Sequence, residues 1–123
     1  MINKKIQTAE QFFLEAQYCE KKNDWQSAIQ FYESALKLQP NHLEACHNLA
    51  IALRNHGKME RALTTSLKAA NLAPDNPTIQ FSVGVSLERL GESERAIEVY
   101  KNIIKQHSDY IPALNNLGRL LDL

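Results

Sequence analysis

The chain has 123 residues, of which 44% are hydrophobic, and it carries 14 basic and 14 acidic side chains. This composition predicts a single folded domain with one small core and excludes disordered, collagen-like and low-complexity chains. A formal net charge of zero, with no basic run longer than two residues, argues against a nucleic-acid partner.

The first eight residues lack an apolar stretch behind their lysines, so they do not resemble a signal peptide. No window approaches the roughly 20 consecutive apolar residues of a membrane span. We therefore expect no membrane association and a reduced, cytoplasmic setting, in which the two cysteines need not act as a disulfide staple.

The strongest signal is an internal repeat. Segments 24–29, 58–63 and 92–97 are mutually offset by 34 residues and share an alanine at the fifth place. Periods of this length are typical of stacked helix-turn-helix units, none of which buries its apolar face alone. The sequence therefore predicts one array over residues 1–123, with three full units at 9–42, 43–76 and 77–110 and a half unit at 111–123.

Two apolar stretches of helical period flank a short polar break in each full unit. We expect seven helices in chain order, at 9–22, 25–38, 43–55, 59–72, 77–90, 93–106 and 111–122. Asn23, Gly57 and Gly91 occupy the breaks, and these residue types tolerate the left-handed conformation that closes a helix. Thr8 and Gln11 have the spacing of a capping box for the first helix.

Small residues stand where the two helices of each unit should cross, at Ala28, Ala62 and Ala96. With Gly84, Gly118 and Pro74 at their repeat positions, the chain resembles the tetratricopeptide repeat family over nearly everything after Thr8. The resemblance implies an all-α, right-handed α-solenoid of helix-turn-helix repeats. Glu15 departs from the pattern because it occupies an apolar slot.

In this family the first helices of successive units line a concave groove, so the resemblance implies that the binding residues lie there. Phe13, His47 and Phe81 are 34 residues apart and predict an apolar stripe along the groove floor. The alternative is that the chain's own helices cover this stripe. The expected partner-binding residues are Phe13, Gln17, His47, Asn48, Ile51, Arg54, Phe81, Val85, Asn115 and Arg119.

No constellation of residues for catalysis stands out, and we expect no cofactor. His42 and Cys46 lie four residues apart and could share a metal, but Cys46 falls on a packing position, which favours a buried thiol over a metal site. The four glycines have repeat spacing and not the spacing of a phosphate-binding loop.

Two functions are open. The first is a non-enzymatic interaction module, a scaffold or adaptor, whose groove binds a peptide segment of another protein. The second is a targeting or assembly segment of a larger multidomain enzyme, because Asn115, Asn116 and Gly118 resemble arrays that precede glycosyltransferase-like domains.

One subtype of the family binds the acidic C-terminus of chaperones through a clamp of basic residues and asparagines. The matching positions here hold Phe13, Gln17, Asn48, Thr78 and Ser82, so only Asn48 fits that clamp. At the other end of the chain, helix 111–122 lacks a partner helix of its own. We expect either further repeats or a homodimer through this helix, in which its uncovered leucines pair.

Overall fold

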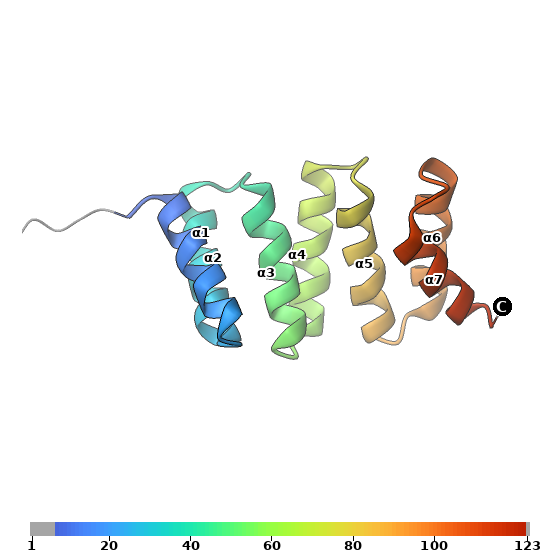
Figure 1. The fold of residues 1–123 in the computed structure, drawn as a ribbon, viewed down its shortest axis with the longest axis horizontal. Helices are drawn as coiled ribbons and strands as arrows, with labels where there is room; N and C mark the ends of the chain where they lie inside the picture. Colours follow the sequence, from blue (N-terminus) through green and yellow to red (C-terminus); the bar gives the residue numbers. More distant parts are fainter. Residues whose placement is uncertain (1–6, 123) are drawn as a thin grey trace, which may run out of the picture.

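The computed structural model describes residues 7–122, which form seven α-helices (Figure 1). They are α1 (Ala9–Lys21), α2 (Trp25–Leu38), α3 (Leu43–Asn55), α4 (Met59–Leu72), α5 (Pro77–Arg89), α6 (Ser93–Gln106) and α7 (Ile111–Leu120). Each helix begins at the residue that the repeat predicts. The ends of α1, α5 and α7 fall one or two residues short of the prediction.

Each helix packs against the next one along the chain, and α3 also contacts α5. The helical hairpins therefore stand side by side in a row from the α1–α2 hairpin to α6 and α7, and α1 lies in front of α2 as α7 lies in front of α6 (Figure 1). No strand occurs within residues 7–122. The predicted all-α solenoid of helical repeats is confirmed.

The turns inside the three hairpins use the expected residues. Asn23 has a φ of 58°, and Gly57 and Gly91 both have a φ of 82°. The predicted capping box is also present, since Thr8 Oγ1 accepts the amide of Gln11 at 3.1 Å and Gln11 Oε1 accepts the amide of Thr8 at 2.8 Å. Local signals therefore fix where the helices start and turn.

The hairpin crossings are tightly packed. Ala28, Ala62 and Ala96 are all fully buried, as the repeat predicts. At the third crossing a Cβ atom on Gly84 would lie 2.4 Å from Cε1 of Tyr100, so only glycine fits against this ring. These close approaches leave no room for larger side chains between paired helices.

The structure explains the charge at Glu15. Its equivalents Leu49 and Val83 are buried in apolar clusters that include residues of the preceding repeat. No helix of residues 7–122 precedes α1, so Glu15 is exposed and accepts a hydrogen bond from Gln7 Nε2 at 3.0 Å. A carboxylate is stable there because the position lies in water.

At the other end, α7 packs on α6 and has no second helix within the described chain. Leu114 and Leu121 are each 39% exposed, although Leu53 and Leu87, which match Leu121 in the earlier repeats, are buried. The expectation of uncovered leucines is confirmed for this pair. Leu117 instead packs against the core, and Leu123 lies outside the described residues.

Candidate functional site

The candidate site is the surface formed by the first helices of the units, α1, α3, α5 and α7, which we call the first-helix face. One of the ten predicted residues is buried, seven are half-buried and two are exposed. In that order they are Phe13; Gln17, His47, Asn48, Ile51, Arg54, Phe81 and Val85; and Asn115 and Arg119.

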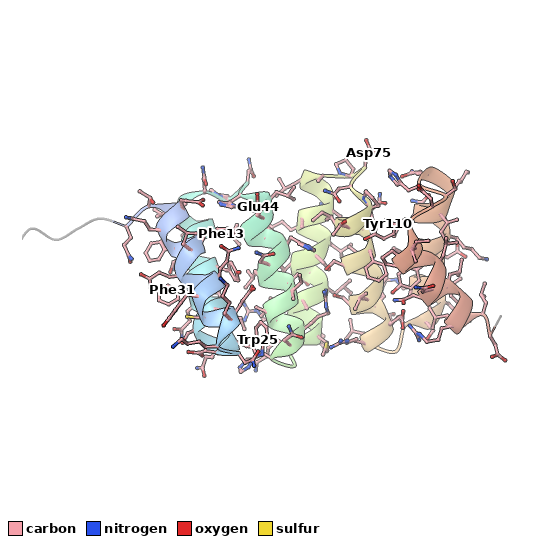
Figure 2. All side chains as sticks on the ribbon, in the orientation of Figure 1. Phe13, Trp25, Phe31, Glu44, Asp75 and Tyr110 are labelled. Atoms are coloured by element: carbon pink, nitrogen blue, oxygen red, sulfur yellow. The ribbon has the colours of Figure 1, made fainter. Side chains whose placement is uncertain are left out.

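Phe13 does not line an open groove, so the prediction that it belongs to the groove floor is wrong. Phe13, labelled on α1 in Figure 2, is only 4% exposed. Its ring centroid lies 4.9 Å from that of His42 and 5.8 Å from that of Tyr32. His42 is held over Phe13 because it is the N-cap of α3, where its Nδ1 atom accepts a hydrogen bond from the backbone amide of Ala45 at 3.1 Å. The apolar stripe therefore does not extend onto α1.

Phe81 makes the same kind of contact in the third repeat but keeps part of its surface. Its ring lies 5.6 Å from that of Tyr100 and 5.9 Å from that of Tyr110, which precedes α7 (Figure 2). Phe81 is thus a packing residue with one accessible side.

Repeats one and three also share a polar set. The Tyr100 hydroxyl donates to Glu88 at 2.7 Å, and the Tyr32 hydroxyl donates to Glu20 in the same way. Burial, helped by these carboxylates, raises the pKa of both phenols above their usual range. Both tyrosines therefore remain neutral donors at physiological pH.

The third repeat extends this set into α7. Asn116 Nδ2 donates to the Tyr100 hydroxyl at 3.1 Å and to Glu88 at 3.2 Å. Arg119 Nη2 donates to both carboxylate oxygens of Glu88, at 2.9 and 2.7 Å. Arg119, predicted for a partner, is thus already paired with its own chain, and this network holds α5, α6 and α7 together.

The middle repeat replaces every member of the set. Arg54 stands at the position of Glu20 and Glu88, and Ser66 stands at the position of the tyrosines. Arg54 Nη1 donates to Ser82 Oγ at 2.8 Å, to the Ser82 carbonyl at 3.2 Å and to Ser86 Oγ at 3.0 Å. It therefore bridges α3 to α5. Burial and the nearby cation of Arg89 lower the pKa of Arg54 from its ordinary value.

His47 lies two helical turns before Arg54 on α3. Its Nδ1 atom is buried and has no hydrogen-bond partner in the described part of the chain. Burial, and secondarily the charge of Arg54, lower the pKa of His47, which keeps the imidazole neutral at physiological pH.

The tyrosine–glutamate sets were missed from the sequence. Glu20 and Glu88, like Tyr32 and Tyr100, are two repeat lengths apart. This double period is visible in the sequence, and it would have indicated that the middle repeat differs chemically from its neighbours.

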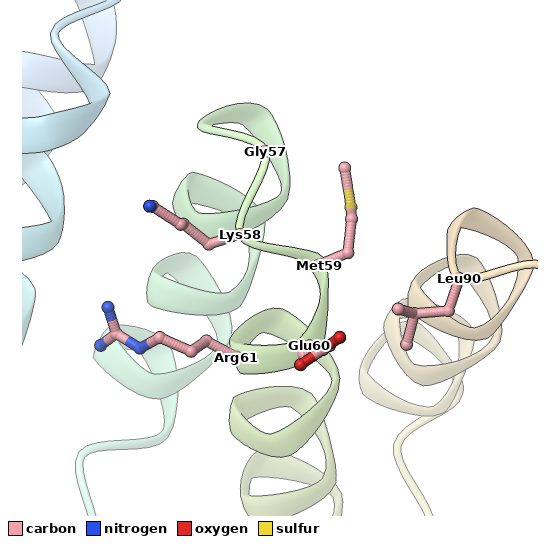
Figure 3. A pocket seen from close by; sticks show the side chains of 6 residues that line it. All are labelled: Gly57, Lys58, Met59, Glu60, Arg61 and Leu90. Atoms are coloured by element: carbon pink, nitrogen blue, oxygen red, sulfur yellow. The ribbon is translucent and has the colours of Figure 1, made fainter.

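Surface hollows occur away from the first-helix face. One is lined by Gly57, Lys58, Met59, Glu60, Arg61 and Leu90, where α4 begins and α5 has just ended (Figure 3). Arg61 and Glu33, whose charged atoms lie 3.3 Å apart, are among the residues that line another hollow. None of the ten predicted residues lines either hollow.

Within residues 7–122 no group of three or more histidine, cysteine or acidic side chains could hold a metal ion. Cys46 is fully buried, and its thiol lies 3.5 Å from the carbonyl oxygen of Thr65. None of the seven helices is both long and apolar enough to cross a membrane.

Comparison with known proteins gives two matching family models, both described as tetratricopeptide repeat, over residues 21–81 and 80–110. The mouse superkiller complex protein 3 is 34% identical over 91 residues, which are 74% of this chain and 6% of that protein. Human protein O-mannosyl-transferase TMTC3 is 34% identical over 97 residues, 79% of this chain and 11% of that protein. The chain thus spans a small part of these relatives.

Photosystem I assembly protein Ycf3 of Synechococcus sp. (strain CC9311) is 30% identical over 95 residues, or 75% of this chain and 55% of that protein. Among solved structures, the first TPR of Spaghetti (RPAP3), bound to the HSP90 peptide SRMEEVD, superposes with a TM-score of 0.87 at 19% identity, covering 99% of this chain and 97% of that one. YrrB, described as a TPR protein with an unusual peptide-binding site, gives 0.84 at 21% identity, covering 89% and 57%. These likenesses show the fold.

Proposed function

Because the chain belongs to the tetratricopeptide repeat family, we propose that it is a non-enzymatic interaction module that binds a peptide segment on its first-helix face. The observation that carries the proposal is the placement of Ile51 and Val85. These apolar side chains occupy the same position in α3 and α5, are half-buried and belong to none of the core clusters. Apolar surface of this kind, bordered by polar side chains, is typical of a partner site.

The other residues of the face supply complementary contacts. Phe81 adds apolar area beside Val85, and the amides of Gln17, Asn48 and Asn115 can hydrogen-bond the backbone of an extended peptide. His47 and Arg54 complete the proposed binding set, from which Phe13 is removed because it is buried. Arg119 stays in the set because its side chain is 58% exposed, although it pairs with Glu88.

Structures of the same fold support this proposal. The first TPR of Spaghetti was solved with a peptide bound, and YrrB is described by its peptide-binding site. A peptide ligand on this chain is an inference by analogy with them, joined to the apolar positions described above.

The test is selection of binders from a display library of random peptides, followed by affinity measurements on charged variants. Ile51→Glu with Val85→Glu should weaken the selected peptides at least about tenfold, because a carboxylate would be desolvated in the apolar contact. The matched control is Leu67→Glu, since Leu67 is 42% exposed on the second helix α4. Equal losses from both variants would place binding elsewhere, and failure to select any peptide would refute the proposal.

A second candidate is that the array targets or assembles a larger multidomain enzyme, with the chemistry outside these residues. The similarity to a stretch of the O-mannosyl-transferase TMTC3 supports it. The complete open reading frame discriminates the two, because an attached catalytic domain would be required by the second and not by the first. A cytoplasmic location is part of the first proposal, and imaging of a fluorescent fusion checks it.

A further inference from the structure

Arg54 is a cation on the first-helix face that no carboxylate balances within residues 7–122. Among residues 7–122, the ion pairs with arginine are Arg61–Glu33, Arg95–Glu92 and Arg119–Glu88, and none involves Arg54. Arg54 is nevertheless half-buried. Removing a charged group from water without an opposite charge is unfavourable, so this position is poorly satisfied in the free protein.

The hydrogen bonds of Arg54 leave one edge of its guanidinium unused. Only Nη1 donates to α5, where Ser82 and Ser86 accept its three contacts. The Nε and Nη2 groups have no acceptor within the described chain, and they are not among its buried unpartnered atoms. They therefore reach solvent as a pair of parallel donors, the arrangement that binds a planar carboxylate through two hydrogen bonds.

The serines on α5 also fix the orientation of this edge. Three contacts to one helix restrict the rotation of a long side chain, so less conformational entropy is lost when a ligand binds. The cation of Arg89 lies near enough to disfavour the charge on Arg54, and Arg89 forms no ion pair in residues 7–122. Both cations therefore favour an anion between α3 and α5.

In the neighbouring repeats, the residue at the position of Arg54 has a hydrogen-bond partner within its own repeat. Glu20 and Glu88 occupy it in repeats one and three, and each accepts from the tyrosine of its own second helix. In the middle repeat the tyrosine is replaced by Ser66, which donates instead to the Leu63 carbonyl at 3.0 Å. In the described part of the chain only the middle repeat places a cation at this position. His47, whose Nδ1 atom has no partner there, lies two helical turns before it on α3.

We infer that Arg54, oriented by Ser82 and Ser86, binds an aspartate or glutamate side chain of the partner peptide at the boundary of α3 and α5. This inference rests on the proposed function, because it names the chemistry of the peptide bound to the same face. It uses none of the positions that match the chaperone-binding clamp, where this chain lacks cations.

The test uses the library peptides with both termini blocked, each made as an acidic form and as a twin in which one Asp or Glu is replaced by Asn or Gln. For the wild type, at least one of these replacements should weaken binding about tenfold, and this identifies the acidic residue that contacts Arg54. In Arg54→Gln the acidic peptide should bind at most about twofold tighter than its twin, which lowers the ratio of their affinities. Arg95→Gln is the matched control, because Arg95 pairs with Glu92 at the start of α6, and it should leave the ratio unchanged.

Arg54→Lys keeps the charge and most of the stem but loses the fork, so it remains useful if Arg54→Gln disturbs folding. The ratio should then fall to a few-fold. The inference would be overturned if Arg54→Gln showed the same ratio as the wild type. If only Arg54→Lys folds, the same ratio in that variant would overturn it. So would selected peptides in which no acidic residue matters, and in both cases peptide binding itself would stand. Selection of no peptide at all would refute the proposed function and, with it, this inference.

Discussion

The Tyr100 hydroxyl connects three helices, because it donates to Glu88 and accepts from Asn116. We expect Tyr100→Phe to lower the free energy of unfolding by about 1 kcal/mol, since two partly buried polar groups lose a partner. Denaturant titration measures the change. Tyr110→Phe is the control, because its hydroxyl makes only a 3.4 Å contact with Thr78 in an exposed position. Equal effects of the two substitutions would contradict the proposed role of the network.

His47 should make stability depend on pH. Burial holds its pKa below the ordinary value of 6.5 in the folded chain. Above that value the imidazole is neutral in both states and adds no pH dependence. Below it, the unfolded chain binds a proton that the folded chain binds less readily, so stability is lost as the pH falls.

We therefore expect the wild type to lose more unfolding free energy than His47→Gln between about pH 7 and about pH 5. The exposed His56 supplies the control, and His56→Gln should follow the wild-type curve. Parallel curves for the wild type and His47→Gln would show that His47 does not titrate differently on folding.

Ile51 and Phe81 separate binding from folding. Ile51→Ser should weaken peptide binding by more than about 1 kcal/mol and change stability less, because Ile51 lies outside the core clusters. Phe81→Ser should in addition cost about 2 kcal/mol of stability, because it removes contacts with Tyr100 and Tyr110. Binding and thermal unfolding measured on both variants check this, and a large loss of helicity in Ile51→Ser would assign Ile51 to the core.

At the scale of the helices, Ala62 is fully buried in the central hairpin formed by α3 and α4. We expect Ala62→Leu to destabilise the chain by about 1 to 3 kcal/mol, because the added methylene groups must enter a fully packed space. Lys68→Leu is the control, because it introduces leucine at an exposed position of the same helix, where lysine and leucine have similar helix propensities. It should alter stability by less than about 0.5 kcal/mol. An unchanged denaturation midpoint for Ala62→Leu would contradict the packing described here.

The sequence predicts these helices well because their signals are local. Turn residues such as Gly57 and Gly91, and the capping box at Thr8, lie within a few residues of the boundaries they set. What covers a side chain depends instead on distant residues. Phe13 has the period of a groove residue, yet His42, held by the capping of the next helix, lies over it.

Charge pairing was equally hard to predict. Arg54 and Arg119 share a face of the array, but Arg119 is neutralised by Glu88, 31 residues away, and Arg54 is not. A sequence read one repeat at a time does not show which of two such cations remains open to a partner. A comparison of equivalent positions across the repeats singles out Arg54, because it stands where the other two repeats have Glu20 and Glu88.

At the scale of the whole molecule, Leu114 on α7 and Leu121 at its C-cap are exposed, and within the described chain no second helix follows α7 to cover them. We expect two copies of this chain to associate through that face, with twofold symmetry. Sedimentation should show a mass that rises with concentration, and Leu114→Glu with Leu121→Glu should abolish the rise. Leu38→Glu, at a leucine 55% exposed on α2, is the control. A strict monomer at every concentration would refute the association.

The central claim is that the first-helix face binds a peptide. The most direct measurement is the NMR amide shifts of the labelled chain during titration with a selected peptide, resolved residue by residue. The largest changes are predicted along α3 and α5, around Ile51, Arg54 and Val85, with small changes on the second helices α4 and α6. Changes concentrated on α4 and α6, for example around Leu67, would contradict the claim.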